Sequence, residues 1–199
     1  MFDSRIKEDC EISSLFITLV NDKSEKWAKI KNRLAGKTVS LSYSDRYLVT
    51  PLGCMLLAHL IAAIKEQIGV NIQNIHISVT RLYNRQFDSS RTDVDRDYEN
   101  NLNRNNFLEE SILSLVGLRP IIIDNGYIEH ERCLTIESDY EELCIRPDAG
   151  IANGWKPFGR SYEGCSDDDF RNDWDMEMNL YNQKKNYKGI LYTISYNKF

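Results

Sequence analysis

No apolar run in the 199-residue sequence is long enough to span a bilayer comfortably. The longest such run, residues 52–64, is interrupted by His59 and is typical of a buried helix. The first ten residues, MFDSRIKEDC, carry charges where a signal peptide needs an apolar stretch. We therefore expect a cytoplasmic protein without a transmembrane segment.

The sequence has five cysteines and no Cys-x-x-Cys pair, so it lacks the spacing of a disulfide framework or a four-thiolate zinc site. The five are Cys10, Cys54, Cys133, Cys144 and Cys165. This odd, widely spaced set favours free, mostly buried thiols in a reducing compartment.

Several common site motifs are also absent. The sequence has no Gly-rich P-loop, no Gly-x-Gly-x-x-Gly, no His-Glu-x-x-His and no Gly-x-Ser-x-Gly. The usual nucleotide-binding, zinc-protease and hydrolase classes are therefore not expected. We expect neither a cofactor nor a metal ion.

Excess positive charge is missing as well, since the formal net charge is −5. Residues 161–180 hold seven acids and one base, so the acidity belongs to one segment and the rest is nearly neutral. This balance opposes non-specific coating of nucleic acid but leaves a local basic site open. Five arginines are interleaved with acids between residues 81 and 106, which favours a solvated face. They are Arg81, Arg85, Arg91, Arg96 and Arg104.

What is present is an alternation of strand and helix patterns. Strands are expected at residues 38–43, 74–80, 120–124, 128–137, 142–146 and 189–196. Helices are expected at the end of residues 4–34, over residues 51–67, and through Phe107 to a stop at Gly117. This order predicts an α/β fold, a mixed sheet flanked by helices with parallel pairing in its first half. We divide the chain into a helical segment, 1–36, and an α/β domain, 37–199, with an acidic insertion at 161–180.

One histidine has neighbours that suggest chemistry. On a strand, His130, Arg132, Leu134 and Ile136 point to one face, because side chains alternate with period two. An imidazole beside a guanidinium suits a phosphate, which the guanidinium binds and the imidazole can attack. The same spacing also fits a strand that turns two polar residues toward solvent.

The pattern His-x-Arg-x-x-x-x-Glu, from His130 to Glu137, resembles the His-x-Lys-x-x-x-x-Asp motif of the phospholipase D superfamily. It is more similar still to the phospholipase-D-like C-terminal domain of MIT-domain proteins. The segments SDRYL at 44–48 and CIRPDAGI at 144–151 are similar to flanking segments of those domains, so the resemblance covers residues 37–156. Weaker similarity connects these segments to bacterial antiviral-defence proteins linked to helicases.

The resemblance implies a phospholipase-D-like fold with His130 as the nucleophile, Arg132 as the phosphate ligand and Glu137 in place of a supporting Asp. One active site of that superfamily needs two motifs, so a single copy implies a homodimer. Arginine replaces lysine and glutamate replaces aspartate here, which favours a degenerate site that binds without cleaving.

Six further residues are candidate ligand contacts. They are Asp45, Arg46, Tyr47, Arg146, Asp148 and Trp155. Asp45 follows a strand at its carboxyl end, where open α/β sheets place their sites, although an aspartate there can also cap the turn. Arg146 and Asp148 also fit a structural ion pair, and Trp155 a core position.

The leading functional hypothesis is therefore a phospholipase-D-like accessory module in a bacterial system such as anti-phage defence. It would bind a phosphate-bearing ligand, such as nucleic acid, or a protein partner, as a homodimer or a subunit of a larger complex. One alternative is a metal-independent phosphodiesterase or nuclease that uses His130. The other is a structural subunit that docks through residues 161–180.

Overall fold

The computed structural model describes residues 25–46, 48, 51–81, 101–128, 132–147 and 192–198. The described helices are α3 (Glu25–Leu34), α4 (Pro51–Ile68) and α5 (Asn101–Val116). The described strands are β1 (Thr38–Asp45), β2 (Asn71–Thr80), β3 (Ile121–Asn125), β4 (Cys133–Ser138), β5 (Glu141–Pro147) and β6 (Tyr192–Lys198).

The helix boundaries follow from local chemistry. Pro51 opens α4, where its fixed φ suits the first helical position and its missing N–H costs nothing. Gly69 and Gly117, with φ of 74° and 78°, follow the ends of α4 and α5 in the left-handed conformation that only glycine adopts cheaply. The expected helices at these positions are therefore confirmed.

The strands form one six-stranded sheet in the order β3-β2-β1-β4-β5-β6. β1, β2 and β3 are parallel neighbours, whereas β4, β5 and β6 continue the sheet in antiparallel pairs. The predicted mixed α/β sheet with parallel pairing in its first half is thus confirmed. β2 begins earlier than residue 74, because Asn71 already pairs with Thr38 of β1.

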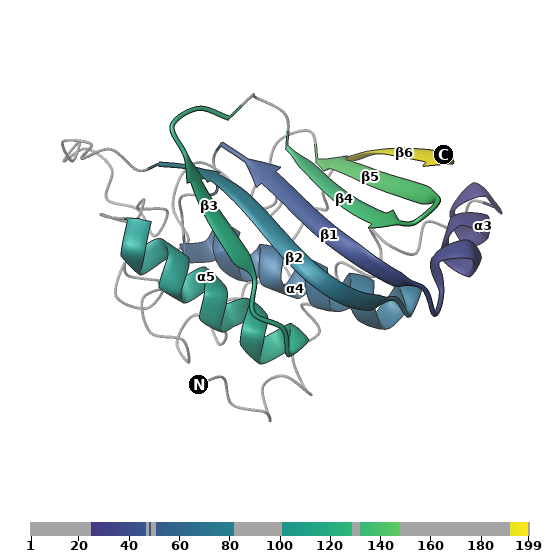
Figure 1. Ribbon diagram of the computed structural model, residues 1–199, viewed down its shortest axis with the longest axis horizontal. Coiled ribbons are helices and arrows are strands. Elements are labelled where there is room, and N and C mark those ends of the chain that lie inside the picture. The colour runs from purple at the N-terminus through teal and green to yellow at the C-terminus, as the bar shows by residue number, and fades with distance from the viewer. Residues whose placement is uncertain are drawn as a thin grey trace, which may run out of the picture.

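The helices α4 and α5 lie against one face of the sheet (Figure 1). Alternate side chains of β1 turn toward that layer and are buried, whereas Ser40, Ser42 and Ser44 face the other way. Ile30 and Leu34 of α3 join the same core. Among the described residues, helices therefore cover a single face, and the opposite face of β1 carries small hydroxyl side chains.

The two ends of the parallel strands differ in chemistry. We call the edge where β1, β2 and β3 end the carboxyl edge, and the edge where they begin the amino edge. β4 starts at the carboxyl edge, because Cys133 pairs with Ser44. Glu141 of β5 and Lys198 of β6 pair with each other at the amino edge.

The prediction of free thiols is wrong for one pair. Cys133 and Cys144 form a disulfide between β4 and β5, with their Cα atoms 6.4 Å apart. Thr135, two residues after Cys133, pairs with Cys144, so the two cysteines are diagonal neighbours on one face of the hairpin. Cys54 is a free, buried thiol, as predicted.

None of the three described helices is both long and apolar enough to cross a membrane. Within the described ranges, no three His, Cys, Asp or Glu side chains gather as a set of metal ligands. The acidic segment 161–180 lies outside the described residues.

Candidate functional site

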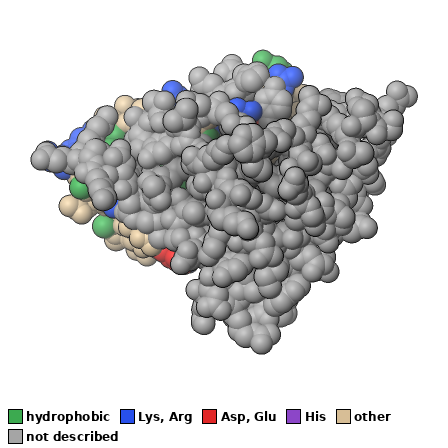
Figure 2. Space-filling view, turned by 180° about the vertical axis from the view of Figure 1, so that it is seen from behind, with side chains coloured by type: hydrophobic (Ala, Val, Ile, Leu, Met, Phe, Trp, Pro, Cys, Tyr) green, Lys and Arg blue, Asp and Glu red, His purple; other side chains and the backbone are tan. Residues whose placement is uncertain are grey.

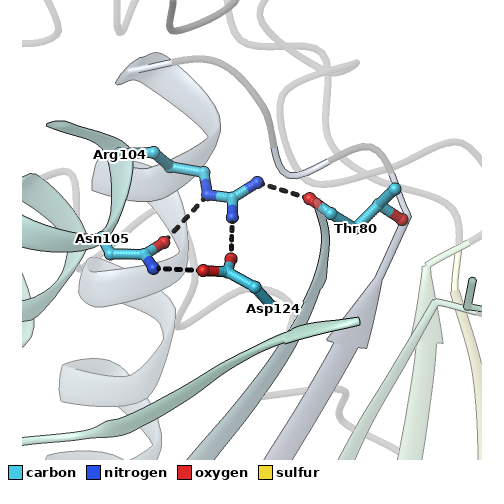
Figure 3. A network of polar contacts seen from close by, with 4 residues as sticks. All are labelled: Thr80, Arg104, Asn105 and Asp124. Carbon is cyan, nitrogen blue, oxygen red and sulfur yellow. Dashed lines mark hydrogen bonds and ion pairs between the residues drawn. The ribbon is translucent and has the colours of Figure 1, made fainter. Parts of the chain in front are cut away.

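A buried arginine holds together the carboxyl edge on the side of β2 and β3. Arg104, in the first turn of α5, is fully buried. Its Nη1 donates to the backbone oxygen of Thr80 at 2.7 Å, and its Nη2 pairs with the carboxylate of Asp124 (Figure 3). The guanidinium therefore joins the ends of two parallel strands to a helix.

Asn105 completes this network. Its amide oxygen accepts from Arg104 Nε at 3.1 Å, and its amide nitrogen donates to the second Asp124 oxygen at 3.0 Å. Both oxygens of the half-buried carboxylate are thus bound. The charges are mutually neutralised and hydrogen-bonded, which is the condition for keeping a guanidinium inside a protein.

The prediction of a solvated face is wrong for Arg104. It lies four and eight residues before Leu108 and Ile112, so all three share the buried stripe of α5. Asp124, at the carboxyl end of a parallel strand, is the partner that makes this burial possible. The rule that singled out Asp45 also applies to Asp124, the last residue of the strand expected at residues 120–124.

A second polar group lies on the β1 side of the same edge. Asp45 is 3% exposed and accepts a 2.8 Å hydrogen bond from the Tyr43 hydroxyl. Arg132 Nε lies 3.4 Å from Asp45 Oδ1. Burial, followed by the nearby Asp45 charge, raises the pKa of Tyr43 well above its ordinary value, so the phenol stays a hydrogen-bond donor.

Cys54, near the start of α4, is affected electrostatically by both groups. The pKa of its thiol is raised to about 12, mainly by burial, while the charge of Arg104 opposes this shift and the charge of Asp45 adds to it. A thiol with this pKa is almost fully protonated at neutral pH and is a poor nucleophile. Cys54 is therefore a core residue of this edge.

Among the described residues, two that the sequence suggested for a site contact each other directly. Arg132 and Asp45 make an ion pair, and the side chain of Arg132 keeps 15% of its exposure. Glu137 is exposed, because its side chain points to the face of β4 opposite to that of the buried Leu134 and Ile136. Glu137 therefore does not join the pair of Asp45 and Arg132.

The remaining expected residues are either exposed at the same edge or outside the described chain. Arg46 is exposed in the turn after β1, and Arg146 is exposed near the end of β5. His130, Tyr47, Asp148 and Trp155 lie outside the described residues. The described part of the carboxyl edge thus presents one half-buried arginine, oriented by a carboxylate, beside a fully neutralised internal network.

The fold and the candidate site define an α/β domain whose carboxyl edge is stabilised by internal ion pairs. Comparison with known proteins identifies the family. A family model described as "DEAD/DEAH box helicase YjiV, C-terminal domain" matches residues 9–189. The match covers most of the chain, which therefore belongs to this family. No curated protein and no solved structure matched the chain.

This match corrects the phospholipase D interpretation. The chain is not a phospholipase-D-like module, and the nuclease and acidic-docking alternatives have no support. The His-x-Arg-x-x-x-x-Glu pattern is short. The alternation of inward and solvent-facing side chains near β4 accounts for part of it without an active site. Arg132 precedes the inward positions of β4, where Asp45 binds it, and Glu137 lies on the solvent side. The homodimer was expected because of the same resemblance, so that reason for expecting it no longer holds.

Proposed function

We propose that this chain works as an accessory C-terminal domain of a DEAD/DEAH-box helicase. It would assist a motor within a larger protein or complex in the cytoplasm and leave nucleotide hydrolysis to that motor. The family match over residues 9–189 carries the proposal.

The one Gly-Lys-Thr triplet of the chain, residues 36–38, supports an accessory role. In a P-loop this triplet follows a strand and opens a helix, so that its lysine reaches a phosphate. Here the triplet follows α3 and opens β1. Gly36 N donates to Gly69 O at 2.8 Å, and Lys37 pairs with Glu141. The triplet thus closes a helix–strand junction.

The carboxyl edge supports the second half of the proposal, which is that Asp45 and Arg132 form its working site. Ligands of open α/β sheets bind beyond the carboxyl ends of the strands. Arg104 stiffens this edge from inside, and Arg132 combines a carboxylate partner with partial exposure. A guanidinium oriented by a carboxylate presents its remaining donors in a defined direction.

The test is a domain exchange. A helicase of the matched family is prepared without its C-terminal domain, and this chain is attached at the same position. We expect duplex unwinding to rise at least severalfold above that of the truncated motor, and the isolated chain to hydrolyse no ATP. An unrelated domain of similar size is the control for simple tethering.

Two results would count against the proposal. One is ATP hydrolysis by the isolated, highly purified chain. The other is a chimera no better than the control fusion although the attached chain is folded. Arg132→Ala in the chimera tests the site, with Arg81→Ala as the matched control, because Arg81 is an exposed arginine at the end of β2. Equal activity of both variants would remove the site assignment and leave the accessory role.

A further inference from the structure

The amino edge carries a second surface, built from α3, the β4–β5 turn and β6. We call the amino-edge surface the set of Arg33, Lys37, Tyr140, Tyr196 and Lys198. Figure 2, the view from behind, shows Lys and Arg side chains at the end of the molecule where α3 lies. The last turn of α3 contains two bases and no acid.

Arg33 is exposed and oriented by an aromatic ring. Its Nη1 donates to the Tyr196 hydroxyl at 3.4 Å, and its guanidinium carbon lies 5.9 Å from the Tyr196 ring centroid. The hydrogen bond to Tyr196 is the main cause that raises the pKa of Arg33. No carboxylate lies within ion-pair distance of Arg33 in the described chain, so Nε and Nη2 can donate to an anion.

Lys198 is a second cation without an ion pair in the described chain, although Glu141 lies opposite it in the strand register. The Glu141 carboxylate is engaged elsewhere, by the ammonium group of Lys37. Hydrogen bonds from Lys37 and then Tyr196 lower the pKa of Glu141. Glu141 therefore pairs directly with Lys37 and acts on Lys198 and Arg33 only through longer-range electrostatic attraction.

An exposed aromatic residue directly precedes Glu141, the strand partner of Lys198. Tyr140, in the turn just before Glu141, is 71% exposed. The large exposed aliphatic residues of the described chain are Leu102, Leu113, Ile121 and Ile123, on α5 and β3. They are separated from β6 by the width of the sheet. Cations with an exposed tyrosine and no large exposed aliphatic group suit phosphates and bases better than a bilayer.

We propose that the amino-edge surface binds single-stranded nucleic acid, with Arg33 and Lys198 contacting phosphates and Tyr140 stacking on a base. The surface is at the opposite edge of the sheet from the site formed by Asp45 and Arg132. This inference rests on the proposed function for its biological context, because a helicase motor produces single strands. The physical argument for it is the positive charge of Arg33 and Lys198 together with the exposed ring of Tyr140.

The experiment is fluorescence anisotropy with labelled dT20 and U20 and the full chain, between 50 and 200 mM NaCl. We expect Arg33→Ala with Lys198→Ala to weaken binding about tenfold at 100 mM salt, and to reduce the slope of log affinity against log salt by about 1.4, or about 0.7 per lost contact. Tyr140→Ala should weaken binding on the order of tenfold without changing that slope. Asp139→Asn, which removes a negative charge beside Tyr140, should tighten it.

Arg81→Ala is the matched control, because it removes one exposed positive charge at the opposite edge of the sheet. We expect it to bind like the wild type. An equal loss in Arg81→Ala, or no binding by the wild type at 50 mM salt, would overturn the inference. Tighter binding to vesicles containing 30% phosphatidylserine, sensitive to the same variants, would replace it with a lipid surface. Far-ultraviolet circular dichroism verifies that each variant is folded.

This test and the domain exchange fail independently. Oligonucleotide binding with an inactive chimera would support this surface and contradict the accessory role. An active chimera without oligonucleotide binding would do the reverse.

Discussion

The two edges of the sheet use charge in opposite ways. At the carboxyl edge, Arg104 is fully buried and its donors face Thr80, Asn105 and Asp124. At the amino edge, Arg33 is exposed and rests on the single ring of Tyr196. The first guanidinium serves the fold, because removing it would leave a partly buried acid. The second costs the fold little and can serve a partner.

The disulfide extends this difference. It joins β4 to β5 on the side of the hairpin where Cys133 pairs with Ser44, near the end of β1. The carboxyl edge therefore has covalent and ionic constraints, whereas the amino edge is held by Lys37 and Glu141 and by the tyrosine contact. Four changes test whether the two edges differ in stability as this contrast requires.

The largest effect is expected for Arg104→Ala. The substitution leaves the Asp124 carboxylate without its cation and the Thr80 carbonyl without its donor. We therefore expect the free energy of unfolding to fall by about 3 kcal/mol. Urea denaturation measures the loss. Arg119→Ala is the control, because Arg119 and Glu109 form an exposed pair, for which less than about 0.5 kcal/mol is expected. Similar losses in both variants would show that burial of Arg104 does not matter.

Cleavage of the disulfide comes next. Cys133 and Cys144 are separated by 11 positions in the sequence, and closing a loop of that length stabilises a fold by about 2–3 kcal/mol. Reductant, or serine at both positions, should lower the urea midpoint of the protein. Alkylation of the unreduced, unfolded protein should leave this pair unlabelled and label Cys54. Labelling of all three cysteines would contradict the bond.

Tyr43→Phe should have a smaller effect, of about 1.5–2 kcal/mol. The change removes only the hydroxyl that donates to the buried carboxylate of Asp45, and hydrogen bonds to charged groups have about this strength. Urea denaturation again gives the value. Tyr140→Phe is the matched control at the amino edge and should be neutral, because that side chain is 71% exposed. A neutral Tyr43→Phe would mean that Asp45 finds another donor.

The smallest effect concerns pH at the amino edge. The pKa of Glu141 is lowered in the fold, so its ion pair with Lys37 stabilises the protein fully above the ordinary pKa near 4.5. That contribution is lost as the pH falls below 4.5 and through the lower, folded pKa. Glu141→Gln should lower the free energy of unfolding at pH 7 and reduce the change of that free energy between pH 5 and 3, as measured by urea denaturation. An unchanged curve would show that this ion pair contributes nothing.

Local sequence patterns predicted the elements but not their partners. Alternation in β1 and the glycines after α4 and α5 depend on nearest neighbours, so strands and helices could be inferred at roughly correct positions. Burial of Arg104 depends on Asp124, which lies 20 positions along the chain on another element. A pattern confined to one helix cannot reveal a partner at that distance.

Register decided the remaining site contacts. Ser44 pairs with Cys133, and one further step along the antiparallel pair places Asp45 opposite Arg132. The sequence suggested both residues separately, and only the pairing of β1 with β4 brings them into contact. A second register, that of β4 with β5, explains the disulfide, since Cys133 and Cys144 meet diagonally across these two strands, and neither strand alone specifies their alignment.

The order of strands also has a kinetic consequence for the amino edge. β6 pairs with β5 although residues 148–191 separate them, so this pairing must close a long loop, whereas the β4–β5 hairpin closes a short one. We therefore expect β6 to dock after the β4–β5 hairpin has formed. Tyr196 and Lys198 arrive with that strand, so Arg33 acquires its aromatic support only after that hairpin has formed. A chain in which β6 has not yet docked would have the carboxyl edge assembled, whereas Tyr196 and Lys198 would not yet have joined the amino-edge surface.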